Sequence, residues 1–130
     1  MARRTSKYPT ELELEILKIL WRDGEATVRQ VKKQLSNFRE LAYTSVMTMM
    51  TIMTEKGYLK RSKKANCYIY KPQITEQETT RGMLGDVVDR LFDGSATAAM
   101  VNLLETGDID KAELAQLRKL ITRKGKEVQQ

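Results

Sequence analysis

The sequence lacks histidine altogether and contains a single cysteine, Cys67, among its 130 residues. Without histidine, the chain lacks the commonest general base and the commonest metal ligand of proteins. One thiol can form no disulfide within the chain, and a zinc site built from cysteine and histidine needs more ligands than are present. We therefore expect no metal, no other cofactor and no enzymatic activity.

Long apolar runs are also missing, and none approaches the roughly 20 residues that a helix needs to span a bilayer. The basic N-terminus from Met1 to Lys7 is not followed by the apolar stretch of a secretion signal. No P-loop and no GxGxxG turn occurs. A cytoplasmic bacterial protein is the simplest interpretation, with one domain or one domain and an appendage.

Positive charge is concentrated in the first part of the chain. Residues 1–74 contain 15 Lys and Arg against 7 Asp and Glu, a net charge of +8. Residues 75–130 contain 8 against 10, a net charge of −2. Such asymmetry is typical of one part that binds a polyanion and another with a different task. We predict a nucleic-acid-binding domain over 1–74 and a second domain over 75–130.

Capping signals and apolar spacing predict three helices before residue 57. Thr10 and Thr27 each have Glu or Gln three residues later, the pattern of a capping box. Apolar stripes follow both, and glycines stop the first helix after Asp23 and the third at Gly57. The alternation from Leu59 to Pro72 predicts a basic β-hairpin with Lys63–Asn66 at its tip. A mainly α fold with a small β-hairpin, the winged helix-turn-helix, is expected.

The third helix has two faces of different chemistry. Val46, Met49, Met50 and Met53 fall on one side and are predicted to be core. The other side is rich in threonine, whose hydroxyl can bond phosphate or a base edge and whose methyl can pack on thymine. The N-terminal end of such a helix points into the major groove. The predicted DNA contacts here are Tyr43, Thr44, Ser45, Met47, Thr48 and Thr51.

Basic residues of the hairpin form a second set of predicted DNA contacts. Lys60, Arg61, Lys63 and Lys64 lie where a wing meets phosphates or the adjacent minor groove. Further backbone contacts are expected from Arg3, Arg4, Lys32 and Lys33. Together these residues predict double-stranded DNA as a partner.

The second domain is predicted to contain three short helices, the first capped by Thr75 and the last starting near Asp110. The tail Arg123–Gln130 is expected to fray. So small a unit rarely buries enough apolar surface alone, so it packs on the first domain or pairs with a second copy. The residues expected in a dimer interface are Leu84, Val87, Val88, Leu91, Phe92, Met100, Val101, Leu104, Leu114, Leu117, Leu120 and Ile121.

Four segments together resemble the penicillinase repressor family of BlaI, MecI and CopY type: Leu12–Trp21, Ala42–Met50, Lys56–Leu59 and Tyr68–Pro72. The resemblance implies a homodimeric transcriptional repressor on a palindromic operator in front of resistance-type genes such as β-lactamase, and of its own operon. It carries recognition contacts over to Thr44, Ser45, Met47 and Thr48, and the wing to Arg61 through Tyr68. The helices after residue 74 correspond to the dimerisation region.

The same resemblance implies release by proteolysis, triggered by a membrane sensor protease. The family's Asn-Phe cleavage step falls on Asn102 and Leu103, where leucine replaces phenylalanine. Two further departures concern Ile52-Met53, where many relatives carry Arg-Leu, and the C-terminus, which lacks the paired cysteines of the copper-responsive branch. Copper sensing is therefore not expected, because Cu(I) requires soft thiolates.

Two other interpretations stay open. A MarR-like winged-helix regulator would be released by a small ligand in place of proteolysis. A winged helix used only for protein contacts would show no salt-dependent DNA affinity. The match from Val101 to Leu104 favours the repressor over the first, and the +8 half favours it over the second.

Overall fold

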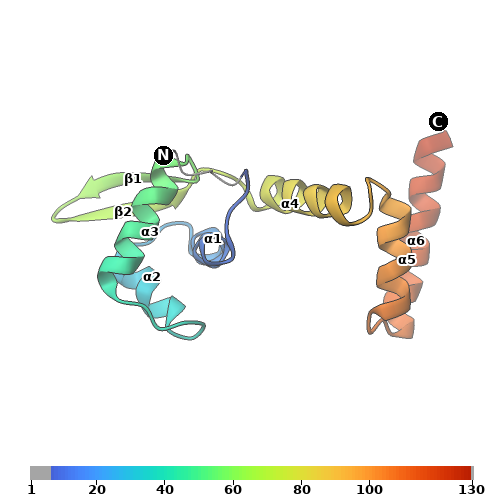
Figure 1. The fold of residues 1–130 in the computed structure, drawn as a ribbon, viewed down its shortest axis with the longest axis horizontal. Coiled ribbons are helices and arrows are strands. Elements are labelled where there is room, and N and C mark those ends of the chain that lie inside the picture. Colours follow the sequence, from blue (N-terminus) through green and yellow to red (C-terminus); the bar gives the residue numbers. More distant parts are fainter. Residues whose placement is uncertain (1–6, 130) are drawn as a thin grey trace. The chain divides into compact units, whose positions relative to one another are not determined.

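The computed structural model describes residues 7–129, which form six helices and one two-stranded antiparallel sheet (Figure 1). This confirms the predicted mainly α fold with a small β-hairpin. The elements are α1 (Glu11–Asp23), α2 (Val28–Leu35), α3 (Tyr43–Glu55), β1 (Leu59–Lys64), β2 (Cys67–Pro72), α4 (Glu76–Leu91), α5 (Ala96–Thr106) and α6 (Lys111–Gln129). None of the helices described here has both the length and the apolarity needed to cross a membrane.

The chain divides into two compact units inside α4, one ending at Leu84 and the other starting at Gly85. The first half of α4 joins the first unit because Thr79 is buried there. A Cβ on Gly82 would lie 2.8 Å from the Tyr8 ring, so a larger residue there would require the ring to shift. The functional division between 1–74 and 75–130 stays a prediction. The boundary between the compact units lies ten residues later in the chain, after Leu84.

Two capping boxes fix the starts of α1 and α2. The Thr10 hydroxyl accepts from the Glu13 N–H at 3.3 Å, and the Glu13 carboxylate accepts from the Thr10 N–H at 2.9 Å. Thr27 and Gln30 repeat the arrangement at 3.2 and 2.9 Å. Each box satisfies two N–H groups that a helix start otherwise leaves unpaired. Both boxes were predicted from the sequence, and the structure confirms them.

The core of the first unit brings together one face from each of its first three helices and the base of the hairpin. On α3, Val46, Met50 and Met53 are fully buried, as predicted, whereas Met49 is half-buried at the edge of the core. This burial fixes which side of α3 is left for solvent. Within residues 7–129, the buried apolar residues are Ile16, Leu17, Ile19, Leu20, Ala26, Val28, Val31, Leu35, Val46, Met50, Met53, Leu59 and Tyr70.

An ion pair joins α1 to the end of α3. The Lys56 ammonium lies 2.9 Å from the Glu13 carboxylate, whose side chain is only 1% exposed. Burial, and then the nearby negative charge of Glu13, raise the pKa of Tyr58 above its usual value. Because Glu13 also caps α1, the pair sets the C-terminal end of α3 against the start of α1.

The hairpin has a two-residue turn at Ala65–Asn66, with Lys64 paired to Cys67 across it. Ala65 adopts a φ of 55°, a left-handed conformation that favours glycine. At the other end, Tyr70 exchanges two hydrogen bonds with Ala26, at 2.9 and 3.1 Å. This bridge fixes the hairpin to the loop between α1 and α2, so the wing has a defined position beside the helices.

The second unit contains no buried residue in α5 or α6, and these two helices are not packed closely on each other. The Ser95 hydroxyl accepts from the Ala98 N–H at 3.1 Å, and the Asp110 carboxylate accepts from the Glu113 N–H at 2.8 Å. These bonds cap α5 and α6 as helices in their own right. Most of the apolar side of each helix is therefore exposed within the described chain.

The prediction that the tail frays from Arg123 is wrong for its described residues, because α6 continues to Gln129. Arg123, Lys124, Lys126, Glu127 and Gln129 are good helix formers that outnumber Gly125 and Val128, and the stretch contains no proline. Lys124 and Glu127 also lie 3.9 Å apart on consecutive turns. Local propensity therefore outweighs the tendency of a chain end to unfold here.

Candidate nucleic-acid interface

The N-terminal half of α3 presents the polar face that the sequence predicted. Tyr43, Thr44, Ser45, Met47 and Thr48 are all exposed, and the core residues lie on the other side of the helix. Tyr43 and Met47 retain 44% and 41% exposure, so both large side chains reach the surface of this face. The predicted contacts on α3 are thus available to a partner, although their contact with DNA stays a prediction.

Thr51 differs from the other threonines of this face. It is half-buried, and its hydroxyl donates to the Met47 carbonyl oxygen at 2.9 Å. A hydroxyl that bonds its own helix is less available to a phosphate or a base. We expect Thr51 to contribute less to DNA binding than Thr44 or Thr48.

The start of α3 has no side-chain cap, unlike the starts of α1 and α2. Ala42 occupies the capping position and carries no acceptor. The first N–H groups of α3 therefore lack a side-chain acceptor in the described structure and carry the positive end of the helix dipole. An uncapped helix start of this kind is suited to a phosphate oxygen.

A groove of about 450 Å³ separates the start of α3 from the hairpin. Tyr43 and Met47 line it from α3, and Tyr68 lines it from β2. The first turn of α2 contributes Arg29, an exposed cation that the sequence reasoning did not select. The sequence feature that could have identified Arg29 is its position within the capping box at the start of the second helix. The complete lining is Thr27, Val28, Arg29, Tyr43, Met47, Asn66, Cys67, Tyr68 and Tyr70.

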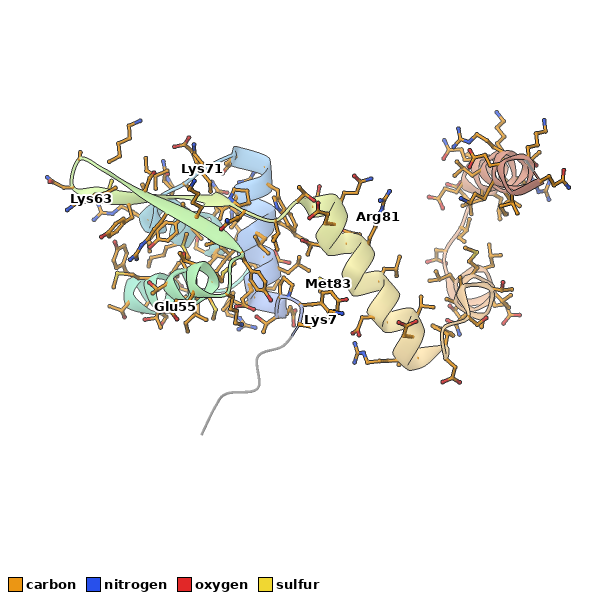
Figure 2. The ribbon with its side chains drawn as sticks, turned by 90° about the horizontal axis from the view of Figure 1, so that it is seen from above. Lys7, Glu55, Lys63, Lys71, Arg81 and Met83 are labelled. Atoms are coloured by element: carbon orange, nitrogen blue, oxygen red, sulfur yellow. The ribbon has the colours of Figure 1, made fainter. Side chains whose placement is uncertain are left out.

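The strand register separates the four predicted wing cations into two pairs. Arg61 lies opposite Tyr70, and Lys63 lies opposite Tyr68, so both cations share the face of the hairpin that carries the buried Tyr70. Lys60 and Lys64 alternate with them and belong to the other face. Lys63 projects from the outer end of the hairpin (Figure 2). The wing therefore presents cations on both sides.

Arg61 has a defined neighbour. Its guanidinium carbon lies 4.5 Å from the centre of the Tyr68 ring, a cation–π distance. Neither strand contains a carboxylate, so the hairpin offers Arg61 no ion pair. Stacking occupies the face of the guanidinium and leaves its N–H edge free for an acceptor such as a phosphate.

Among the described residues, the remaining cations predicted to contact DNA do not line this groove. On α2, Lys32 is half-buried and Lys33 is exposed. Arg3 and Arg4 lie outside the described residues. No cluster of three or more Cys, Asp or Glu side chains suited to a metal ion occurs in residues 7–129.

The candidate dimer residues lie on α4, α5 and α6 and are largely uncovered. Leu91 and Ile121 retain 71% and 65% exposure. The exposed members are Leu84, Leu91, Met100, Val101, Leu104, Leu114, Leu120 and Ile121, and the half-buried ones are Val87, Val88, Phe92 and Leu117. Asn102 and Leu103 are exposed in the middle of α5, where the Asn102 carbonyl accepts from the Thr106 hydroxyl at 2.7 Å.

Comparison with known proteins gives a match to the family model "Penicillinase repressor" over residues 9–123. The penicillinase repressor of Bacillus licheniformis is 23% identical over 112 residues, covering 86% of this chain and 88% of that protein. The transcriptional regulator BlaI of Mycobacterium tuberculosis is 33% identical over 105 residues, covering 79% and 76%.

Among solved structures, a mutant MarR from E. coli, complexed with operator DNA, aligns with a TM-score of 0.51 at 17% identity. The alignment covers 88% of this chain and 74% of that one, and it supports the winged-helix fold. The family match spans both the exposed face of α3 and the hairpin wing, the two parts of the candidate interface. The chain belongs to the penicillinase repressor family, whose members are DNA-binding transcriptional repressors and not enzymes.

Proposed function

We propose that this chain acts in the cytoplasm as a homodimeric repressor that binds a palindromic operator through α3 and the hairpin. The observation that carries the proposal is the exposed, threonine-rich start of α3 beside a basic wing. In this proposal Thr44, Ser45, Met47 and Thr48 contact base edges, and Tyr43 and Arg29 contact the flanking phosphates. The groove between α3 and the hairpin is proposed to face the DNA backbone.

The uncovered apolar residues of the second unit support the homodimer. Large apolar side chains contiguous on a surface mark an interaction site, and α5 and α6 have no buried residue of their own. A second copy offers the same surface, so a two-fold contact would cover both at once. Two copies would then hold two α3 helices at the fixed spacing that a palindrome requires.

Few side chains on α3 can read bases, so the dimer would also be needed for sequence specificity. The face contains no Arg, Asn or Gln, which make the strongest paired contacts to bases. Hydroxyls and a methionine discriminate less, so one copy alone would distinguish sequences weakly. Specificity would come from two half-sites read together.

The regulated genes are proposed from the relatives. Proteins named penicillinase repressor and BlaI point to resistance genes of the β-lactamase type, and the repressor's own operon is a further candidate target. Footprinting the protein on its own upstream DNA at two salt concentrations tests this directly. We expect a protected palindrome that weakens steeply at the higher salt. Absence of any protected site would contradict the proposal.

Release from the operator is proposed to follow cleavage between Asn102 and Leu103, triggered by a membrane sensor protease. Both residues are exposed, and a cut in the middle of α5 would separate α6 from the rest of the dimer surface. Replacing both residues should keep the repressor on DNA in induced cells, as judged by reporter expression and by the length of the protein. Normal induction by these variants would instead favour release by a small ligand, as in the MarR-like alternative.

A further inference from the structure

Cations gather on one side of α6, far in sequence from the winged helix. Lys111, Ala115, Arg118, Thr122 and Lys126 follow i, i+4, i+7, i+11 and i+15, so they lie along one side of the helix. Lys119 and Arg123 adjoin them on consecutive turns. Arg118, Lys119, Thr122, Arg123 and Lys126 line a shallow hollow of about 370 Å³. We call these five residues the basic face of α6.

The basic face has no carboxylate to neutralise it. Within α6, the only acidic residues are Glu113 and Glu127, and Glu127 lies 3.9 Å from Lys124, outside this face. All four cations are exposed, and the ion pairs found in residues 7–129 include none of them. The second domain is acidic as a whole, with a net charge of −2, so this cluster runs against the charge of its surroundings.

Stabilisation of the helix dipole does not account for the cluster. Favourable contacts of cations with the negative end of a helix are confined to about the last turn. Because α6 ends at Gln129, only Lys126 is placed to make them, and Arg118 and Lys119 lie several turns earlier. An external anion is the remaining source of opposite charge.

We propose that the basic face of α6 is a second DNA-binding surface, which contacts the sugar–phosphate backbone without regard to sequence. From Arg118 to Lys126 the helix rises about 12 Å, a length over which duplex DNA carries roughly seven phosphate charges. Four cations on that length match a run of phosphates.

Duplex DNA is a better match than a membrane surface. A helix lying on a bilayer must insert its apolar side, which on α6 includes Leu114, Leu117 and Ile121. That side is directed away from the basic face and is the one assigned to the partner copy, so the inference rests on the proposed homodimer. A dimer that covers the apolar side leaves the basic face outward.

The test uses the full-length protein and a scrambled duplex without operator sequence. The double variant Arg118→Gln/Arg123→Gln removes two cations of the basic face. Its matched control, Arg90→Gln/Lys124→Gln, removes two cations of the same unit that already pair with Asp86 and Glu127. Affinity is measured by fluorescence anisotropy over a salt series, and dimer content is checked by sedimentation.

We expect the first double variant to lower the slope of log K against log salt by about 2 to 4, since each lost phosphate contact contributes about 0.9 and a dimer loses up to four. The control should keep the wild-type slope. Equal slopes for the two variants would overturn the proposal. So would loss of binding to vesicles rich in anionic lipid while DNA binding persists. Failure of the wild type on the operator footprint would contradict the proposed repressor instead, because the scrambled duplex contains no operator.

Discussion

Individual side chains of the wing decide how its charge is presented to DNA. Arg61 stacks on Tyr68 and shares the Tyr70-bearing face with Lys63, whereas Lys60 and Lys64 belong to the other face. A charge count along the hairpin predicts four equal cations, and only the strand register separates them. The sequence therefore predicts the wing, but the positioning of Arg61 by a ring depends on a diagonal contact between strands.

Replacing Tyr68 with leucine should release Arg61 and weaken operator binding. Cation–π contacts at exposed sites are worth about 0.5–1 kcal/mol, so the loss should be about two- to fivefold. Tyr68→Phe keeps the ring and should bind as the wild type does. In a background that already carries Arg61→Ala, the Tyr68→Leu change should have little further effect. Additive losses would show that Tyr68 acts without Arg61.

The Glu13–Lys56 pair supplies a residue-scale prediction about stability. Lys56→Met leaves the Glu13 carboxylate buried without its cation and should lower the free energy of unfolding by about 2–3 kcal/mol. We expect this to be less than the cost for a fully buried pair, because the Lys56 side chain remains 21% exposed. Urea denaturation measures the change. The control Lys18→Met, which removes an exposed pair, should stay within about 0.5 kcal/mol of the wild type.

Among the elements, α3 follows most directly from its sequence. Spacing of Val46, Met50 and Met53 fixes the buried side, and the threonines follow on the other side. Burial of the core thus determines which residues reach DNA. The end of α6 was predicted wrongly, because the expectation of fraying at a chain end gave too little weight to the Arg, Lys, Glu and Gln residues around Gly125.

Thr44→Ala and Thr48→Ala should each weaken operator binding by about 1 kcal/mol, or about fivefold, through loss of one hydrogen bond and one methyl contact. Thr51→Ala should cost less, because its hydroxyl already bonds the Met47 carbonyl. Thr54→Ala is the matched control at the far end of α3, with its hydroxyl bonded to Met50. Anisotropy titrations rank the four variants. A loss for Thr54→Ala as large as that for Thr48→Ala would contradict the assignment of the DNA-facing side.

At the scale of the whole molecule, the two units divide the work. The first has a core, capped helices and a fixed wing, so contacts within the unit account for its fold. The second has helices whose apolar sides are uncovered, so its stability depends on a partner. Sequence periodicity identifies those apolar residues, but it cannot distinguish a contact within the chain from one between chains. The charge asymmetry predicts a functional boundary before α4, and this stays a prediction. The close approach of Gly82 to Tyr8 puts the start of that helix in the first compact unit.

Charge on the apolar side of α6 should therefore separate the copies. Leu117→Asp should shift the protein from dimer to monomer in sedimentation equilibrium, because two buried carboxylates would face each other's apolar surface. The neighbouring Gln116→Asp adds the same charge outside that side and should remain dimeric. Both variants should keep the helical circular dichroism of the first unit, whose core neither substitution touches. A dimeric Leu117→Asp protein would place the contact elsewhere.

The central claim is that two copies read two half-sites at a fixed spacing. The most direct measurement compares binding of the wild type to its footprinted palindrome with binding to the same DNA after about five base pairs are inserted at its centre. An insertion of that length turns one half-site about half a helical turn away from the other. We predict that affinity falls to that of a single half-site and that both half-sites are protected together only on the intact palindrome. Equal affinity for the two DNAs would contradict the account.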